Sequence, residues 1–265
     1  MGTKQNNICK LCRRNPANQK NSHIIPKFFK KRLFPNVGKK HILLLFRGGK
    51  TYKYQDIPKE DHLICSYCEN RIGIIETYCT NHFFNKFHNK SRHNSLFQID
   101  ITQVEEYLIE YVKCLDFNPL IFNLFVNSIV WRASMSKSKL FEQFDIEPEI
   151  LEKIRNQLNA NLKGSYKELI DTIINYIPEN YYSYVIITKK LLSDTPEGSL
   201  SAFKTQEGLF LINLVDYSLL YSTRVKFNQQ LRVIENGDYS NHINIGVGND
   251  DNWRKFHQIY LNKML

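Results

Sequence analysis

Apolar side chains occupy most positions between residues 119 and 135, the most continuous apolar segment of the chain. Pro119 stands at its start, where the first turn of a helix accepts a residue without a backbone N–H. Three further segments place apolar residues at the spacing of one helix face: residues 104–115, 147–162 and 166–176. The pattern therefore predicts a largely helical region over about 101–176.

The pattern changes after residue 180, where apolar residues become mostly β-branched or aromatic. Residues 182–188 and 209–215 are predicted to form strands. Residues 231–234 and 242–245 flank Asn236-Gly237, a pair typical of tight turns, which predicts a β-hairpin. Strands are therefore expected over about 181–247, followed by a terminal helix over 252–264.

The first third of the chain has shorter elements. Residues 22–26 read as extended, because the residue before a proline avoids the helical region. One or two helical turns are predicted over 28–33, short strands over 42–46 and 51–55, and an amphipathic helix from about Glu69. A polar, basic stretch at residues 86–98 reads as a linker. We therefore expect an α+β fold, with an N-terminal module over 1–95 and a helical, then β-rich domain over 96–265.

Positive charge is concentrated in the N-terminal module. Residues 1–95 contain 19 Lys and Arg against 5 Asp and Glu, a balance of 19 − 5 = +14, although the whole chain carries only +10. A basic segment of this kind favours a polyanionic partner, and we expect nucleic acid, DNA rather than RNA. The alternative is a solvated basic surface, which explains the number of lysines but not their segregation.

Two Cys-x2-Cys pairs lie inside this basic module: Cys9 with Cys12, and Cys65 with Cys68. Each pair lets two thiolates of one tight turn reach the same ion, and two pairs complete a tetrahedral zinc site without an open position. The sequence therefore predicts a structural zinc. The other two cysteines, Cys79 and Cys114, are isolated in apolar surroundings and are expected to be small buried residues.

The layout around the cysteines resembles the HNH, or His-Me finger, endonucleases. His23 follows the first pair in Ser-His-Ile-Ile-Pro, Asp61 precedes the second pair, and Glu69 follows it at once. The resemblance covers residues 9–76 and implies a treble-clef, or ββα, module. It also implies hydrolysis of phosphodiester bonds with a catalytic Mg²⁺ or Mn²⁺, with His23 as general base.

At three other positions of the resemblance, this chain has a different residue from the one that is usual in the family. Asp61 and Glu69 stand at the family's middle and helix positions, where Asn and then His or Asn are usual, and Ser22 replaces an Asp before the histidine. Carboxylates are good Mg²⁺ ligands, and Glu76 is a further one on the same helix. Two interpretations follow: a variant nuclease, or a module that binds nucleic acid without cutting it. His62 is an alternative imidazole, and Glu69 could simply complement the helix dipole.

Basic residues next to His23 could hold the nucleic-acid backbone without reading its sequence. They are Lys27, Lys30, Lys31 and Arg32, interleaved with Phe28 and Phe29, and they could equally form a solvated face. Arg132 lies in the apolar helix over 119–135. It is expected either to contact phosphate or the carboxylates of Glu69 and Glu76, or to stand at the helix edge with its head in water.

Longer fragments of the sequence resemble a group of bacterial proteins with HNH-like N-termini. The shared fragments are Ser-His-Ile-Ile-Pro-Lys, Leu-Ile-Cys-x2-Cys-Glu, and Ser-Ile-Val-Trp-Arg-Ala-Ser at residues 128–134. This resemblance implies a bacterial defence or mobile-element setting. The absence of a long apolar run or signal-like N-terminus leads us to expect a cytoplasmic protein without a membrane partner. The C-terminal domain could bind a protein partner or an activating ligand, and a third interpretation makes the chain an interaction subunit of a larger complex.

Overall fold

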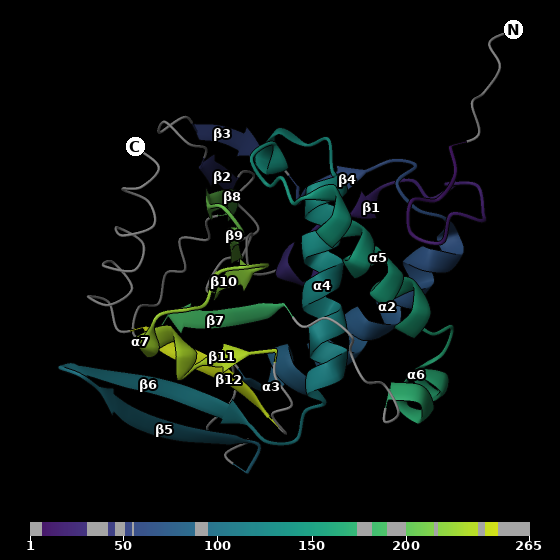
Figure 1. Cartoon of the computed structure of the whole chain (residues 1–265). Coiled ribbons are helices and arrows are strands. Elements are labelled where there is room, and N and C mark those ends of the chain that lie inside the picture. The colour runs from purple at the N-terminus through teal and green to yellow at the C-terminus, as the bar shows by residue number, and fades with distance from the viewer. Residues whose placement is uncertain are drawn as a thin grey trace, which may run out of the picture. The chain divides into compact units, whose positions relative to one another are not determined.

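The computed structural model describes most of the chain (Figure 1). The described residues are 7–30, 42–45, 51–54, 56–87, 95–173, 182–189, 200–214, 217–237 and 242–248. Over these ranges the protein contains both helices and sheets, so the α+β class is confirmed. It divides into two compact units. Unit 1 comprises residues 1–27, 57–84 and 120–180, and unit 2 comprises residues 28–56, 85–119 and 181–265.

This division differs from the expected boundary near residue 95. The helices that follow residue 119 belong to the same unit as the four cysteines, and the strands β2 (Ile42–Leu45) and β3 (Thr51–Tyr54) belong to unit 2. The physical reason is packing: Phe122 on the helix after residue 119 makes an edge contact with Phe83 of the cysteine-bearing segment, at 5.5 Å between ring centroids. Each unit is therefore built from segments distant in sequence.

Unit 1 begins with a small antiparallel pair, β1 (Ser22–His23) and β4 (Lys59–Glu60), in which Ser22 lies opposite Glu60 and His23 opposite Lys59. Helix α2 (Ser66–Tyr78) follows and continues into a π-helical turn, η2 (Cys79–Phe84). Cys65 is its N-cap, with the sulfur accepting a hydrogen bond from the backbone N–H of Cys68. The helix thus begins at Ser66, three residues before the expected start, because the knuckle itself supplies the cap.

Helix α4 (Pro119–Met135) is the core of unit 1. All its residues from 121 to 133 are buried, as expected for a helix that is apolar on every side. Helices α5 (Pro148–Asn161) and α6 (Tyr166–Ile173) follow, with the short turn η4 (Lys139–Phe141) before them. The three helices predicted over these segments are confirmed, with Pro119 and Pro148 as their first residues.

Unit 2 contains a ten-stranded sheet within the described residues, in the order β3-β2-β8-β9-β10-β7-β12-β6-β5, with β11 also paired to β7. Its remaining strands are β5 (Phe97–Val104), β6 (Tyr107–Cys114), β7 (Ser183–Lys189), β8 (Leu200–Gln206), β9 (Leu209–Leu214), β10 (Tyr217–Ser222), β11 (Glu235–Asn236) and β12 (Ile243–Gly248). Most pairs are antiparallel, but β12 runs parallel to β7, and β2 runs parallel to β8. The short helices α3 (Asn85–Phe87) and α7 (Gln229–Arg232), with most of the 3-10 turn η1 (Lys27–Phe29), complete the unit.

One face of this sheet packs a single hydrophobic cluster. It contains Tyr111, Val185, Ile187, Leu209, Leu211, Leu220, Phe227 and Ile234. Strands β9 and β10 are buried at every position, as expected for strands that are covered on both faces. The predicted strands near β2, β3, β7 and β9 are thereby confirmed.

The helix predicted over 104–115 is wrong. Residues 97–104 and 107–114 form the antiparallel hairpin β5–β6, with the turn at Glu105, which adopts a positive φ of 55°. The apolar residues of this segment fit the spacing of a helix face and also that of a strand face. Pairing of Val112 with Ile245 of β12 decides in favour of the strand. Tertiary pairing overrides the local spacing.

The hairpin predicted around Asn236-Gly237 is also wrong. Residues 229–232 form α7, and β11 pairs with β7, not with β12. The side chain of Asn236 instead bridges to the backbone of Asn244, accepting from its N–H at 2.8 Å and donating to its C=O at 2.8 Å. The loop is thus closed by a side chain where strand pairing was expected. The helix expected over 252–264 lies outside the described residues.

The helical turns expected over 28–33 are described only as far as residue 30, and begin as the 3-10 turn η1. Of the expected linker over 86–98, residues 86–87 end α3 and residues 97–98 begin β5. No helix of the described ranges is long and apolar enough to cross a membrane.

Candidate metal centre and the surrounding polar cluster

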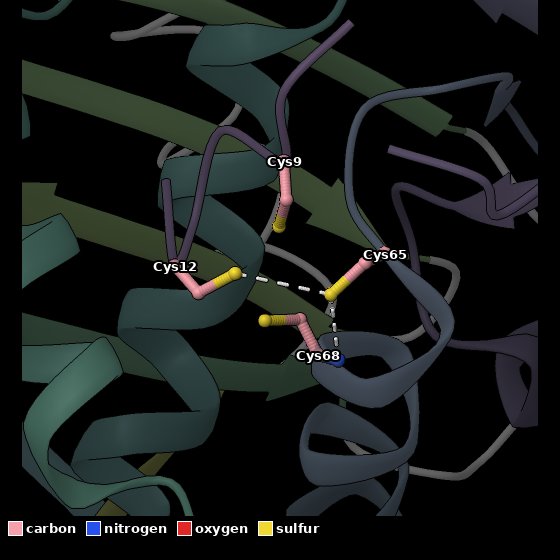
Figure 2. Close-up of side chains that lie close together, drawn as sticks. All are labelled: Cys9, Cys12, Cys65 and Cys68. Atoms are coloured by element: carbon pink, nitrogen blue, oxygen red, sulfur yellow. Dashed lines mark hydrogen bonds between the residues drawn. The ribbon is translucent and has the colours of Figure 1, made fainter. Parts of the chain in front are cut away.

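Two loop segments bring the four knuckle cysteines together. The first turn closes through a hydrogen bond from the N–H of Arg13 to the C=O of Cys9, with Arg13 at a positive φ of 54°. The backbone N–H of Lys10 then donates to the C=O of Leu63, which fixes the first turn against the segment leading into the second. Figure 2 shows the four sulfur atoms converging from these two turns.

The four sulfur atoms lie within 4.8 Å of one another, and all four residues are buried. The Sγ atoms of Cys12 and Cys65 are 3.9 Å apart. A tetrahedral ion with metal–sulfur bonds of about 2.3 Å would place its sulfurs about 3.8 Å apart, so the cluster has the size that such an ion requires. The four cysteines could therefore hold a metal ion, as the sequence predicted.

Close packing of the thiols shifts their protonation. A hydrogen bond from Cys68 lowers the pKa of Cys9 to about 4, and the same contact raises the pKa of Cys68. Burial raises the pKa of Cys65. When one thiol of the cluster loses its proton, the negative charge makes it harder for the neighbouring thiols to ionise. A bound cation would stabilise all four thiolates together.

Two side chains donate to the sulfurs from outside the cluster. Asn15 Nδ2 lies 3.7 Å from the Sγ of Cys65, and Arg71 Nη1 lies 4.0 Å from that of Cys68. Donors of this kind orient thiolate ligands and offset part of their negative charge. Neither residue was predicted from the sequence, although Arg71 stands only three positions after Cys68 and about one turn along the same helix face.

Helix α5 supports both turns of the metal centre. Arg155 donates from Nη1 to the C=O of Leu11, between Cys9 and Cys12, at 2.7 Å. Arg71 donates from Nε to the C=O of Leu162, the C-cap of α5, at 2.9 Å. Both arginines are buried. No local sequence pattern predicts these contacts, because they join residues more than 90 positions apart.

No family model matches the chain. No curated protein and no solved structure matches it either.

The predicted catalytic residues lie near β1, β4 and the first turns of α2. Asp61 accepts the backbone N–H of Asn21 at 2.6 Å, and so closes the loop before β1. Glu69 accepts a hydrogen bond from the hydroxyl of Ser22 at 2.6 Å. His23 is half-buried and follows Ser22 in β1. The alternative imidazole, His62, is exposed and contacts the C=O of Ala17 through Nδ1 at 2.8 Å.

Arg132 of α4 links β1 to α2. Its Nη1 donates to the C=O of His23 at 2.6 Å, and its Nη2 forms an ion pair with the carboxylate of Glu76 at 2.6 Å. The Arg132 side chain is only 1% exposed, so it does not stand at the helix edge with its head in water. Of the expected alternatives, the contact with Glu76 is the one observed.

Glu69 and Glu76 open onto the same groove, which has a volume of about 760 Å³ and follows α2 to Gly164 and Tyr166. Burial raises the pKa of Glu76, the ion pair with Arg132 opposes this shift, and the charge of Glu69 adds to it. A half-buried carboxylate with a raised pKa on the wall of a groove is the type of group that functional sites contain.

The predicted catalytic residues do not assemble into a metal cluster of their own. Within the described parts of the chain, the four cysteines are the only group of three or more His, Cys, Asp or Glu whose ligand atoms all lie within 4.8 Å of one another. His23, Asp61, Glu69 and Glu76 are therefore more dispersed than a preformed Mg²⁺ site. The predicted Mg²⁺ or Mn²⁺ ligands stay a prediction.

The predicted phosphate-binding residues differ in their surroundings. Lys27 is exposed, and Lys30 forms an ion pair with Asp56 at 2.9 Å, which offsets its charge. Lys31 and Arg32 lie outside the described residues. Both isolated cysteines, Cys79 and Cys114, are buried, and burial raises the pKa of each, as expected for thiols that act as small apolar side chains.

Proposed function

We propose that unit 1 is a zinc-stabilised ββα module that hydrolyses phosphodiester bonds of nucleic acid in the manner of the HNH endonucleases. The observation that carries the proposal is that Ser22 and His23 of β1 are joined to the two acidic residues of α2 that line one groove. Ser22 holds Glu69, and Arg132 joins the backbone of His23 to Glu76.

The four cysteines would hold a zinc ion with a structural role. Four sulfur ligands leave no open position for water or substrate, so the reaction takes place elsewhere. Zinc would fix the turn before β1 relative to the first turn of α2. In this treble-clef arrangement the metal positions His23 and Glu69 without touching the substrate.

His23 would accept a proton from the attacking water, because imidazole titrates near neutral pH. Glu69 and Glu76 would bind a divalent cation such as Mg²⁺ or Mn²⁺, which enters with the phosphate and neutralises the charge that develops on it. Among the described residues these carboxylates belong to no group of three or more ligands within 4.8 Å, so the cation would take its remaining ligands from water and the phosphate. The basic residues of the first third would attract the polyanion.

The test is incubation of the purified chain with DNA and RNA in the presence of Mg²⁺ or Mn²⁺. Cleavage should fall by at least about 100-fold in His23→Ala, the usual scale of a lost general base. His62→Ala is the matched control, because His62 is an exposed imidazole beside Asp61 that contacts the C=O of Ala17 and would take no part in the reaction. Equal loss in both variants, or cleavage that persists in His23→Ala, contradicts the assignment of His23.

A second candidate is a module that binds nucleic acid without cutting it. The observation that favours it is that Asp61, Glu69 and Glu76 each accept a hydrogen bond from the protein. This candidate predicts an affinity that falls steeply as salt rises, with no cleavage under any metal condition. Its setting would still be compatible with bacterial defence or a mobile element, and a chain that binds neither DNA nor RNA would instead be an interaction subunit.

A further inference from the structure

The hairpin β5–β6 of unit 2 carries a concentration of exposed apolar side chains. Ile99 is 56% exposed, Ile101 64%, Tyr107 46% and Leu108 65%. These four are half of the eight large hydrophobic residues that are exposed in the described parts of the chain. Exposed apolar residues that gather on one element mark an interaction surface.

Ile99 and Ile101 lie on the same face of β5, because side chains two positions apart share a face. In the hairpin register, Ile99 pairs with Val112 and Ile101 pairs with Glu110. The opposite face carries Tyr111, which belongs to the hydrophobic cluster of unit 2. The exposed isoleucines therefore point away from this cluster, although Val112 and Cys114, nearer the start of β5 on the same face, are buried.

Strand β5 is also an edge. It stands last in the strand order and, among the strands the structure describes, pairs only with β6 (Figure 1). Residues 97–104 contain no proline and no lysine, the residues that usually protect an edge from further pairing. The only charged side chain on the strand, Asp100, forms an ion pair with Lys113 of β6. This edge therefore lacks the side chains that usually block further strand pairing, and Lys113 neutralises its one negative charge.

We propose that this chain forms a homodimer in which β5 pairs antiparallel with β5 of a second copy. A twofold axis at Ile101 would place Ile101 opposite Ile101, Ile99 opposite Gln103, and Thr102 opposite Asp100. Moving the axis by one residue to Asp100 would place two carboxylates opposite each other, which is unfavourable. The register at Ile101 avoids this repulsion and places the most exposed large apolar side chain of β5 at the axis.

Edge-to-edge pairing of two copies suits this surface better than face-to-face packing of their hairpins does. Packing two hairpins face to face would bury Glu110, which lies on the same face as Ile101. Pairing at the edge leaves Glu110 in water and brings the isoleucines of both copies side by side. A twofold contact between two β5 strands also closes the assembly, because each copy uses its β5 edge once and the other end of the sheet, β3, takes no part.

Sedimentation equilibrium of the full chain, over a series of concentrations, tests the proposal. The wild type should be a dimer, and Ile101→Lys should raise the dimer dissociation constant by at least about tenfold, because two ammonium groups would face each other at the axis. Leu108→Lys is the matched control: Leu108 is as exposed as Ile101, but it lies on β6, so β5 separates it from the proposed contact between copies.

Leu108→Lys should leave the dimer intact. A monomeric wild type at every concentration overturns the proposal, and so does a dimer that survives Ile101→Lys. Dissociation of both variants shows that the copies meet through the face of the hairpin, which also overturns edge pairing. Far-UV circular dichroism of each variant establishes that the fold is retained.

A crosslinking experiment tests the register independently of affinity. Ile101→Cys should form a covalent dimer on mild oxidation, because the two side chains would be directly opposite. Leu108→Cys should not. All six native cysteines are buried, so they do not contribute to the crosslink. Equal crosslinking of both variants contradicts the register.

Discussion

Arg132 of α4 is buried and forms an ion pair with the half-buried Glu76 of α2, with 2.6 Å between Nη2 and Oε1. The two residues are 56 positions apart, and the arginine also donates to the C=O of His23. A single guanidinium therefore joins α4, α2 and β1 within unit 1. Removing one partner of such a pair leaves the other charge buried and uncompensated.

We expect Arg132→Met to lower the free energy of unfolding by about 3–5 kcal/mol, because Glu76 loses its counter-charge while most of the side-chain volume is kept. Urea denaturation at saturating zinc measures the change. Lys153→Met is the control, since Lys153 pairs with Glu149 on the surface and should cost less than about 0.5 kcal/mol. The double variant Arg132→Met with Glu76→Gln should recover part of the loss. No recovery would mean that Arg132 acts through its contact with His23 alone.

The raised pKa of Glu76 predicts a pH dependence of stability. Burial raises its folded-state pKa above the unfolded value, so the folded protein binds more protons than the unfolded chain between these two values. The contribution of Glu76 to stability is therefore fully present below about pH 4.3, and is lost as pH rises through the folded-state pKa.

Comparison of wild type with Glu76→Gln isolates this effect, because acid release of zinc affects both proteins equally. The free energy of unfolding of the wild type, relative to Glu76→Gln, should decrease as pH rises from about 4 toward neutrality. A difference that increases with pH would show that Arg132 outweighs burial and lowers the pKa of Glu76.

The four-cysteine cluster predicts a stoichiometric metal. Purified protein should contain about one zinc per chain by elemental analysis, and Cys65→Ala should reduce it to near zero because three thiolates and no substitute ligand remain. Cys114→Ala is the control, since Cys114 is a buried thiol of β6 in unit 2 and does not belong to the four-cysteine cluster. Zinc retained in Cys65→Ala, or absent from the wild type, contradicts the proposed centre.

The support of the metal centre by α5 can be tested with two arginines that share one partner. Arg13 and Arg155 both contact Glu152, but Arg13 is 59% exposed at its side chain and Arg155 only 11%. Arg155→Met should lower the free energy of unfolding by about 2–4 kcal/mol, since it also leaves the C=O of Leu11 without its donor. Arg13→Ala should cost less than about 1 kcal/mol.

Chelator-induced zinc release, followed with a colorimetric indicator, provides a second measurement for this pair. It should be faster in Arg155→Met than in Arg13→Ala, because only the former loosens the turn between Cys9 and Cys12. Equal release rates would show that α5 stabilises the unit without acting on the metal centre.

The sequence by itself determined the features that depend on neighbouring residues. Two turns of identical spacing predicted the cysteine cluster, because the local chain alone sets the geometry of each turn. Pro119 and Pro148 predicted the starts of α4 and α5, since a missing N–H is tolerated only in the first turn. The continuous apolar run of α4 predicted its burial, and the β-branched runs predicted β7 and β9.

Only the tertiary structure decided the features that depend on distant pairing. Residues 104–115 have a spacing that fits a helix, yet they form part of a hairpin, because β12 provides a strand for them to pair with. Asn236 contacts the backbone of Asn244 through its side chain for the same reason: its own backbone, in β11, pairs with β7 and not with β12. Arg71, Arg132 and Arg155 each contact a residue more than 50 positions away, and a buried charge gives no local signal of where such a partner lies. Local spacing fixes turns and helix starts, but the free energy of strand pairing and buried charges is set by whichever segments the fold brings together.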